Sequence, residues 1–269
     1  MNAISEGIVE SAALPAEPPP VDHPDWQALL AARRGAALPE RASELFDLYG
    51  PLCSARAAEG FAVAHLAQSL DGRIATECGV SRWLSGDEDL LHTHRMRALA
   101  DAVVVGVNTV LYDDPQLTVR RCPGEHPVRV IIDPDRRLDG SQRVFRDAAA
   151  TTLVLAGSDR VTTGEHLGLA EIVAVERRGT DLDPHAVRRV LAARGLKRIF
   201  VEGGGTTVSR FIEARALDRL QLTIAPVILG SGRPAVRLPE IRDLRDSLRP
   251  VTRQFRLGAD TMIECIFHE

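Results

Sequence analysis

Hydrophobic and polar positions follow two different patterns after about residue 60. Short runs rich in β-branched and aliphatic residues, most of them ending in turn residues, predict strands at FAVAHLAQSL, ADAVVVG, VRVIID, TLVLAG, EIVAV and KRIFVEGGG. Helices are predicted from the Ser85–Glu88 capping-box pattern to about Leu99, over DPHAVRRVLAARG and over TTVSRFIEARAL. Further strands are predicted at RLQLTIAPVIL and within the last twenty residues, where helix signals are absent.

The order of these elements predicts the fold class. Strands that alternate with helices form β-α-β units, and such units build a mostly parallel central sheet flanked by helices. The strand-rich C-terminal part indicates antiparallel additions at one edge of that sheet. We therefore predict an α/β domain over residues 58–269.

The N-terminal part has a different texture. Residues 1–24 are rich in Pro, Ala and Glu and predict a disordered leader. Residues 25–57 contain two short apolar stretches, WQALLAARRG and LPERASELFDLYG, which predict two small helices, the first ended by Gly35. We interpret this segment as a small helical extension of the main domain.

Composition and charge exclude several classes of protein. The chain has 33 basic and 37 acidic residues and a net charge of -4, so no electrostatic footprint for nucleic acid or an anionic membrane is present. No apolar run approaches the roughly 20 residues that span a bilayer, and the N-terminus lacks a signal-peptide pattern. The four cysteines form no C-x-x-C pair, so neither disulfides nor a metal site are expected. We expect a cytoplasmic protein.

Three glycines between a strand and a helix form the clearest candidate for ligand binding. In VEGGGTTVSRF, the glycines permit close backbone approach and the helix start offers free N–H groups to an anion. Gly203, Gly204, Gly205 and Thr206 are therefore a candidate phosphate cradle. A tight turn without a ligand is the alternative, and the segment is not a G-x-G-x-x-G fingerprint.

A second candidate lies in VVVGVNTVLYDDPQLTVR. A buried strand ends at Gly106, where the polar Asn108 and Thr109 follow, and ligands of α/β sheets collect at the carboxyl ends of strands. One of Asp113 and Asp114 is expected to be a loop or cap residue, and the other a proton donor or a hydroxyl-binding carboxylate. A purely structural Asp-Asp-Pro turn is the alternative.

A third candidate precedes the helix at residues 85–99. Ser81, Arg82 and Trp83 lie just before its start, a position suited to an anionic group. Trp83 is expected either to stack on a heterocycle or to pack in the core.

Taken together, the motifs resemble one family over roughly residues 61–267. The succession SLDGRIA, S-x-W, RMRA, DAVVVGVNTVLYDDPQLTVR, PVRVIID, VEGGGT and IAPVILG is similar to the reductase domain of the riboflavin-biosynthesis deaminase/reductases, whose fold is similar to dihydrofolate reductase. The resemblance implies NADPH-dependent reduction of a phosphoribosylamino-pyrimidine to its ribitylamino form, by a homodimer. The deaminase motifs H-x-E and P-C-x-x-C are absent, so no deaminase activity is expected.

The same resemblance implies roles for the candidate substrate residues. Asp113 would lie by the reacting ribose and assist proton movement, and Glu202 would face the substrate. The expected contacts to the substrate phosphate and pyrimidine are Ser81, Trp83, Arg97 and Arg120. The chain departs from the family at His65, where members commonly have a lysine. Either His65 fills that role with another geometry, or it is a half-buried strand residue.

For the cofactor, the resemblance implies a site between two segments. NADPH would lie along Gly106, Asn108 and Thr109 on one side and along Gly203 to Thr206 on the other. Arg136 or Arg137 would hold its 2′-phosphate, the alternative being a solvated loop.

Two other functions stay open at this point. The first is reduction of another pterin- or pyrimidine-like substrate such as dihydrofolate, which the histidine at position 65 keeps in view. The second is a catalytically silent nucleotide-binding protein. The joint presence of Asp113, Glu202, Arg97 and Arg120 argues against the second.

Overall fold

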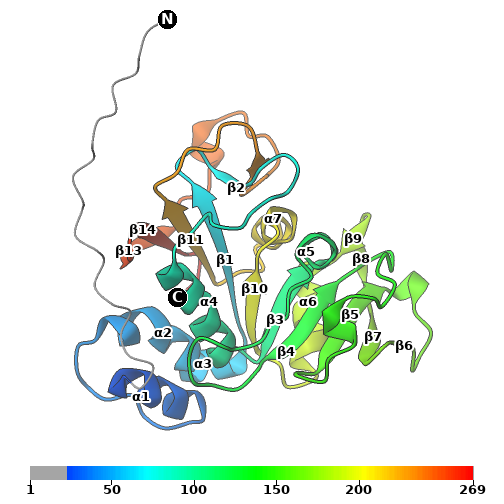
Figure 1. Cartoon of the computed structure of the whole chain (residues 1–269), viewed down its shortest axis with the longest axis horizontal. Coiled ribbons are helices and arrows are strands. Elements are labelled where there is room, and N and C mark those ends of the chain that lie inside the picture. Colours follow the sequence, from blue (N-terminus) through cyan, green and yellow to red (C-terminus); the bar gives the residue numbers. More distant parts are fainter. Residues whose placement is uncertain (1–22, 269) are drawn as a thin grey trace, which may run out of the picture.

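A computed structural model describes residues 23–268 (Figure 1), so the predicted leader lies outside the described residues except for its last two. A ten-stranded sheet, in the order β13-β14-β11-β1-β10-β3-β4-β5-β7-β6, forms the centre of the molecule. Its strands are β1 (Phe61–Ser69), β3 (Ala102–Gly106), β4 (Val128–Ile132), β5 (Thr152–Gly157), β6 (His166–Leu167), β7 (Ala170–Val175), β10 (Arg198–Glu202), β11 (Arg219–Ala225), β13 (Val251–Leu257) and β14 (Asp260–Ile266).

Most neighbouring strands in this sheet run parallel. The exceptions are β6 at one edge and the β13–β14 hairpin, whose β14 pairs antiparallel with β11. The predicted α/β class, with a mostly parallel sheet and antiparallel strands added at an edge, is confirmed.

Helices cover both faces of the sheet, which explains the continuous apolar runs in its central strands. They include α4 (Asp87–Leu99), α6 (Pro184–Ala192) and α7 (Gly205–Glu213). Successive residues of β1 point to opposite faces: Ala62 and Ala64 belong to the core that contains the apolar residues of α6 and α7. Val63 belongs to the other core, together with Met96 of α4.

Both predicted helices of the N-terminal extension are present, as α1 (Pro24–Arg33) and α2 (Glu44–Cys53), followed by α3 (Ala55–Glu59). They lie beside α4 (Figure 1) and share its core, to which Trp26 and Tyr49 contribute fully buried rings. The N-terminal extension therefore shares a hydrophobic core with the main domain.

Other elements were not predicted from the sequence, or begin differently. The N-cap of α4 is Gly86, whose N–H donates to Asp260 Oδ2 at 2.8 Å, so the predicted capping box is wrong. A helix, α5 (Val107–Asp113), directly follows β3; at seven residues it is too short to show helical periodicity. Small two-stranded pairs are formed by β2 (Arg73–Ala75) with β12 (Arg233–Pro234) and by β8 (Arg177–Arg178) with β9 (Asp181–Leu182). No helix found within residues 23–268 has the length and apolar character needed to cross a membrane.

Candidate active site

A cleft of about 930 Å³ opens at the carboxyl ends of β1, β10 and β3. These three parallel strands are neighbours in the sheet, so the residues that follow them meet at one edge. Helix α4 and the β2–β12 pair supply other walls of the cleft. The predicted site residues that line it are His65, Ser81, Arg97, Asn108, Thr109, Asp113, Arg120, Glu202, Gly203, Gly204, Gly205 and Thr206.

Three predicted site residues do not line this cleft. Trp83 has a positive φ of 69° and is 95% exposed, so the alternative that it packs in the core is wrong. Arg136 also has a positive φ, of 58°, and forms an ion pair with Glu165. The adjacent Arg137 instead reaches a cleft residue, because its Nη1 donates to Asn108 Oδ1 at 2.9 Å.

The third, Gly106, acts through packing. A Cβ built on Gly106 would come within 3.0 Å of the Thr207 hydroxyl, so the end of β3 and the first turn of α7 can approach each other only because residue 106 is glycine. Gly205, the first residue of α7, is confined in the same way, since its Cβ would lie 2.5 Å from the carbonyl oxygen of Ala235. Gly106 thus permits the close approach of α7 to β3, and Gly205 its close approach to the segment at β12.

The turn between β10 and α7 needs glycine for its backbone conformation. Gly203 and Gly204 have φ angles of 71° and 74°, in the region that side-chain-bearing residues rarely adopt. No atom lies within 4 Å of a Cβ built on Gly203, so the turn leaves open space at this wall of the cleft. The first turn of α7 then presents backbone N–H groups without helical partners.

Arg97 of α4 and Glu202 of β10 form a paired group at the base of the cleft. Arg97 Nε donates to Glu202 Oε2 at 2.6 Å, Nη2 contacts Glu202 Oε1, and Nη1 donates to the Thr118 carbonyl at 2.9 Å. Arg97 is buried and Glu202 nearly so, which makes this two-pronged contact strong. The carboxylate is therefore held in one orientation beside the cleft.

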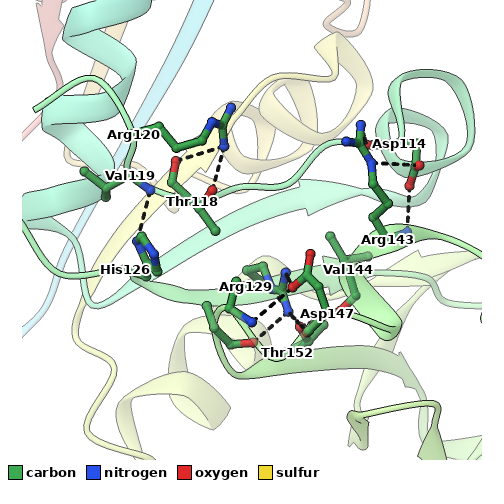
Figure 2. A network of polar contacts seen from close by, with 12 residues as sticks. Asp114, Thr118, Val119, Arg120, His126, Arg129, Arg143, Val144, Asp147 and Thr152 are labelled. Atoms are coloured by element: carbon green, nitrogen blue, oxygen red, sulfur yellow. Dashed lines mark hydrogen bonds and ion pairs between the residues drawn. The ribbon is translucent and has the colours of Figure 1, made fainter.

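Arg120 adds a second positive charge to the same wall. Figure 2 shows its guanidinium turned back to Thr118, whose Oγ1 accepts from Nη1 at 2.6 Å. Partial burial, followed by the charge of Arg97, lowers the pKa of Arg120. Burial and the same two arginines lower the pKa of His94 to about 4, so that imidazole is neutral. Glu202 neutralises the charge of only one of the two arginines. The positive charge that remains suits this wall to bind an anion.

Asp113 and Asp114, at the end of α5, point to different surroundings. Asp113 lines the cleft, and burial raises the pKa of its carboxyl against the opposing effect of Arg82 and Arg233. Asp114 is bound to Arg143 (Figure 2), whose backbone N–H and Nε donate to it at 2.8 and 3.1 Å. A carboxyl with a raised pKa keeps its proton to higher pH, so Asp113 can act as a proton donor in the cleft.

Sequence analysis missed part of the site. Asp89, Thr93 and Arg97 all line the cleft from α4, and their spacing of four residues was a signal for a common helix face. Asp89 Oδ1 lies 3.0 Å from His65 Nε2 and accepts from the hydroxyl of Thr223 at 2.7 Å. The predicted histidine is therefore joined to two residues that no motif indicated.

Comparison with known proteins identifies the family. A model described as the RibD C-terminal domain matches residues 61–255. The 2,5-diamino-6-ribosylamino-4(3H)-pyrimidinone 5′-phosphate reductase of Methanothermobacter thermautotrophicus is 37% identical over 214 residues, covering 76% of this chain and 96% of that protein. The riboflavin biosynthesis protein RibD of Aquifex aeolicus is 35% identical over 199 residues, covering 73% and 55%.

A solved structure agrees with these matches. The diaminohydroxyphosphoribosylaminopyrimidine deaminase/5-amino-6-(5-phosphoribosylamino)uracil reductase of Thermotoga maritima superposes with a TM-score of 0.66 at 28% identity, covering 77% of this chain and 56% of that one. The chain thus spans about half the length of the Aquifex and Thermotoga proteins, and nearly all of the Methanothermobacter reductase. On the match over residues 61–255, the chain belongs to the RibD C-terminal domain family.

Proposed function

We propose that this protein reduces a ribosylamino-pyrimidine 5′-phosphate to its ribitylamino form, with NADPH as the electron donor. The compound to test first is 2,5-diamino-6-ribosylamino-4(3H)-pyrimidinone 5′-phosphate, because the Methanothermobacter reductase, matched over 96% of its length, is named for it. The 5-aminouracil analogue, for which the Thermotoga protein is named, is the second.

The observation that carries this proposal is the position of Asp113 in the cleft. Reduction of the ribosylamino group opens the sugar ring and leaves a new hydroxyl, so an oxygen must receive a proton. Burial raises the pKa of the Asp113 carboxyl, which favours the protonated form needed for that step. Glu202, fixed by Arg97, offers acceptor oxygens that would orient substrate hydroxyls.

The residues along the β10–α7 turn fit a nicotinamide dinucleotide. Bound there, the reduced cofactor would supply the hydride. The open space at Gly203 admits a pyrophosphate close to the backbone, and the start of α7 presents N–H groups to it. Arg137, next to Asn108, has stronger support than Arg136 as the contact for a 2′-phosphate. This arginine is the reason to expect NADPH rather than NADH.

The part of the cleft lined by Arg97 and Arg120 fits the substrate phosphate. Arg97 and Arg120 face one space with a single carboxylate between them, which leaves excess positive charge. A phosphate dianion would relieve the repulsion between the two guanidinium groups. Ser81, also on the cleft, is a further contact within this proposal.

The test is oxidation of NADPH, followed by loss of absorbance, with each pyrimidine and with dihydrofolate as separate substrates. Asp113→Asn is the diagnostic variant, and Asp114→Asn is its matched control. Both replace a carboxyl group by an amide at adjacent positions, and asparagine tolerates the left-handed backbone of residue 114, at φ 39°. We expect turnover to fall about 100-fold or more in the first variant and to stay near wild type in the second.

Other outcomes would redirect or reject the proposal. Turnover of dihydrofolate alone would reject the ribosylamino substrate. Equal losses in the two variants would reject Asp113 as the proton donor. A homodimer and a cytoplasmic location complete the proposal; sedimentation of the purified chain and fractionation of its source cells test them.

A further inference from the structure

A buried histidine on β1 borders the cleft without a part in the steps above. His65 is 5% exposed, lines the cleft, and lies opposite Glu202 in the parallel pairing of β1 with β10. A buried imidazole needs partners for its ring nitrogens, because an unpaired polar atom away from water is costly. The partners show in which form His65 is held.

One ring nitrogen of His65 is fully engaged on the buried side. Nε2 lies 3.0 Å from Asp89 Oδ1 and 3.1 Å from Thr223 Oγ1. The Thr223 hydroxyl gives its proton to Asp89, at 2.7 Å, so only its lone pairs face the histidine. Both neighbours of Nε2 are therefore acceptors, and Nε2 carries a proton.

The other ring nitrogen, Nδ1, is left to the cleft. Among residues 23–268 no group hydrogen-bonds to Nδ1. The atom is not fully buried either. It is thus in contact with the open space that His65 lines. A proton on Nδ1 would point at whatever occupies that space.

The charges around His65 favour a proton on both nitrogens. Asp89 of α4 touches the ring directly, and Glu202 of β10 adds a second negative charge that Arg97 balances. Burial lowers the pKa of His65, but the charge and hydrogen bond of Asp89, with the charge of Glu202, outweigh it, so the net pKa is raised. From β11, the neutral Thr223 hydroxyl hydrogen-bonds to the ring.

The nearest other histidine is held in the opposite state. The ring of His92 lies 5.2 Å from that of His65, and its Nε2 donates to Gln221 Oε1 at 3.0 Å. Its Nδ1 accepts from the Tyr49 hydroxyl at 2.9 Å. Each nitrogen of His92 has one neutral partner, and burial together with the charge of His65 lowers its pKa to about 3. The contacts of His65 therefore favour its charged form, and those of His92 favour its neutral form.

We propose that Asp89 and Thr223 are positioning residues that hold His65 as an imidazolium, with its Nδ1–H directed into the cleft as a donor to an oxygen of the substrate. The substrate part rests on the proposed reductase function. The positioning part is a property of the free protein. Asp89 is 2% exposed and its Oδ1 is engaged by His65 and Thr223, so its effect on turnover would pass through His65.

The first experiment is a titration of the free, full chain by ¹⁵N-histidine NMR. Loss of one signal set in His65→Gln assigns the residue among the eight histidines. We expect both nitrogens of His65 to be protonated at pH 7. Asp89→Asn keeps the shape of the side chain but removes its charge, and should lower the pKa of His65 by about 1 to 3 units. Thr223→Val should lower it less.

The matched control is Asp87→Asn, on the same helix. The Asp87 side chain is 75% exposed and pairs with Arg121, so its loss should leave the His65 titration unchanged. A neutral His65 at pH 7 in the wild type would overturn the proposal. An equal pKa of His65 in Asp89→Asn and in the wild type would overturn it as well. If Asp89→Asn does not fold, Thr223→Val and the wild-type titration still decide.

Turnover measured against pH then separates positioning from simple damage. Below the pKa that His65 has in Asp89→Asn both proteins carry the charge, whereas between that pKa and the raised wild-type pKa only the wild type keeps it. The NMR titrations give one pH value in each of these two ranges. We expect kcat/KM of the variant to fall about tenfold or more between these pH values relative to wild type, mainly through KM. Equal losses at both pH values would reject the role. Because the NMR titration needs no substrate, failure of the reductase assay leaves its result intact.

Discussion

Replacing Gly106 or Gly205 by alanine should disturb the cleft in two physically different ways. At position 106, the new methyl group would come within 3.0 Å of the Thr207 hydroxyl, whereas ordinary contacts begin at 3.4 Å. At position 205, it would meet the carbonyl oxygens of Ala235 and Pro234, at 2.5 and 2.9 Å. The first obstacle is a side chain that can be cut back, and the second is backbone that cannot.

Overpacking of this kind costs about 1 to 3 kcal/mol of the free energy of unfolding. Gly205→Ala gains back about 1 kcal/mol from the higher helix propensity of alanine. Its remaining cost should come from displacement of β12, which carries Pro234 at the cleft wall. We therefore expect weaker NADPH binding in Gly205→Ala, together with a midpoint of thermal unfolding lowered by at most about 8 °C.

Gly106→Ala offers the sharper test, because Thr207 can be truncated. In the double variant with Thr207→Ala, the obstructing oxygen is gone and we expect recovery of about 1 to 2 kcal/mol relative to the sum of the single changes. Thr207→Val is the control, since it keeps a branched group at the same place and should not rescue. Denaturant unfolding measures the free energy of the wild type, of the three single variants and of the two double variants. The steric explanation would be refuted if the free-energy changes of Gly106→Ala and Thr207→Ala simply add in the double variant. It would also be refuted if Thr207→Val restores the stability of Gly106→Ala.

Four further outcomes follow from the polar and titratable groups. Arg97→Lys loses the two-pronged contact with Glu202, and kcat/KM should fall about tenfold or more in steady-state assays. Tyr49→Phe leaves His92 Nδ1 unpaired, and urea unfolding should show a loss of about 1 to 3 kcal/mol. Because the folded pKa of His92, about 3, lies below the unfolded value, its contribution is intact above pH 6.5 and falls by about 1.4 kcal/mol per pH unit below it; His92→Gln should remove this slope. Because the protonated Asp113 is the proposed acid, kcat should fall as pH rises through its raised pKa, a limb that pH-rate profiles of Asp113→Asn should lack.

Features decided by local chemistry could be predicted from the sequence. The β10–α7 turn is one, because consecutive glycines after a strand need only their own backbone freedom to turn. The convergence of Asp113 and Glu202 is another, since both follow neighbouring parallel strands and so reach one edge of the sheet. Most predicted strands and helices hold for the same reason: their periodicity is contained in a few residues.

Features decided by distant contacts or by one backbone angle could not be predicted. Asp89 and Thr223 are 134 residues apart, and only the assembled sheet brings them to His65. Trp83 and Arg136 have positive φ angles and do not line the cleft, and no sequence pattern signals such angles at these residue types.

The strand order also dictates when the site can form. Strand β1, which carries His65, is made early, yet its two neighbours in the sheet, β10 and β11, follow more than a hundred residues later. Strand β11 in turn pairs with β14, at residues 260–266. Pairings of such long range are slow to form, and β1 stays unpaired until late in synthesis. On a ribosome, the reductase site would therefore be among the last parts of the molecule to assemble, and β1 the segment most in need of protection from aggregation.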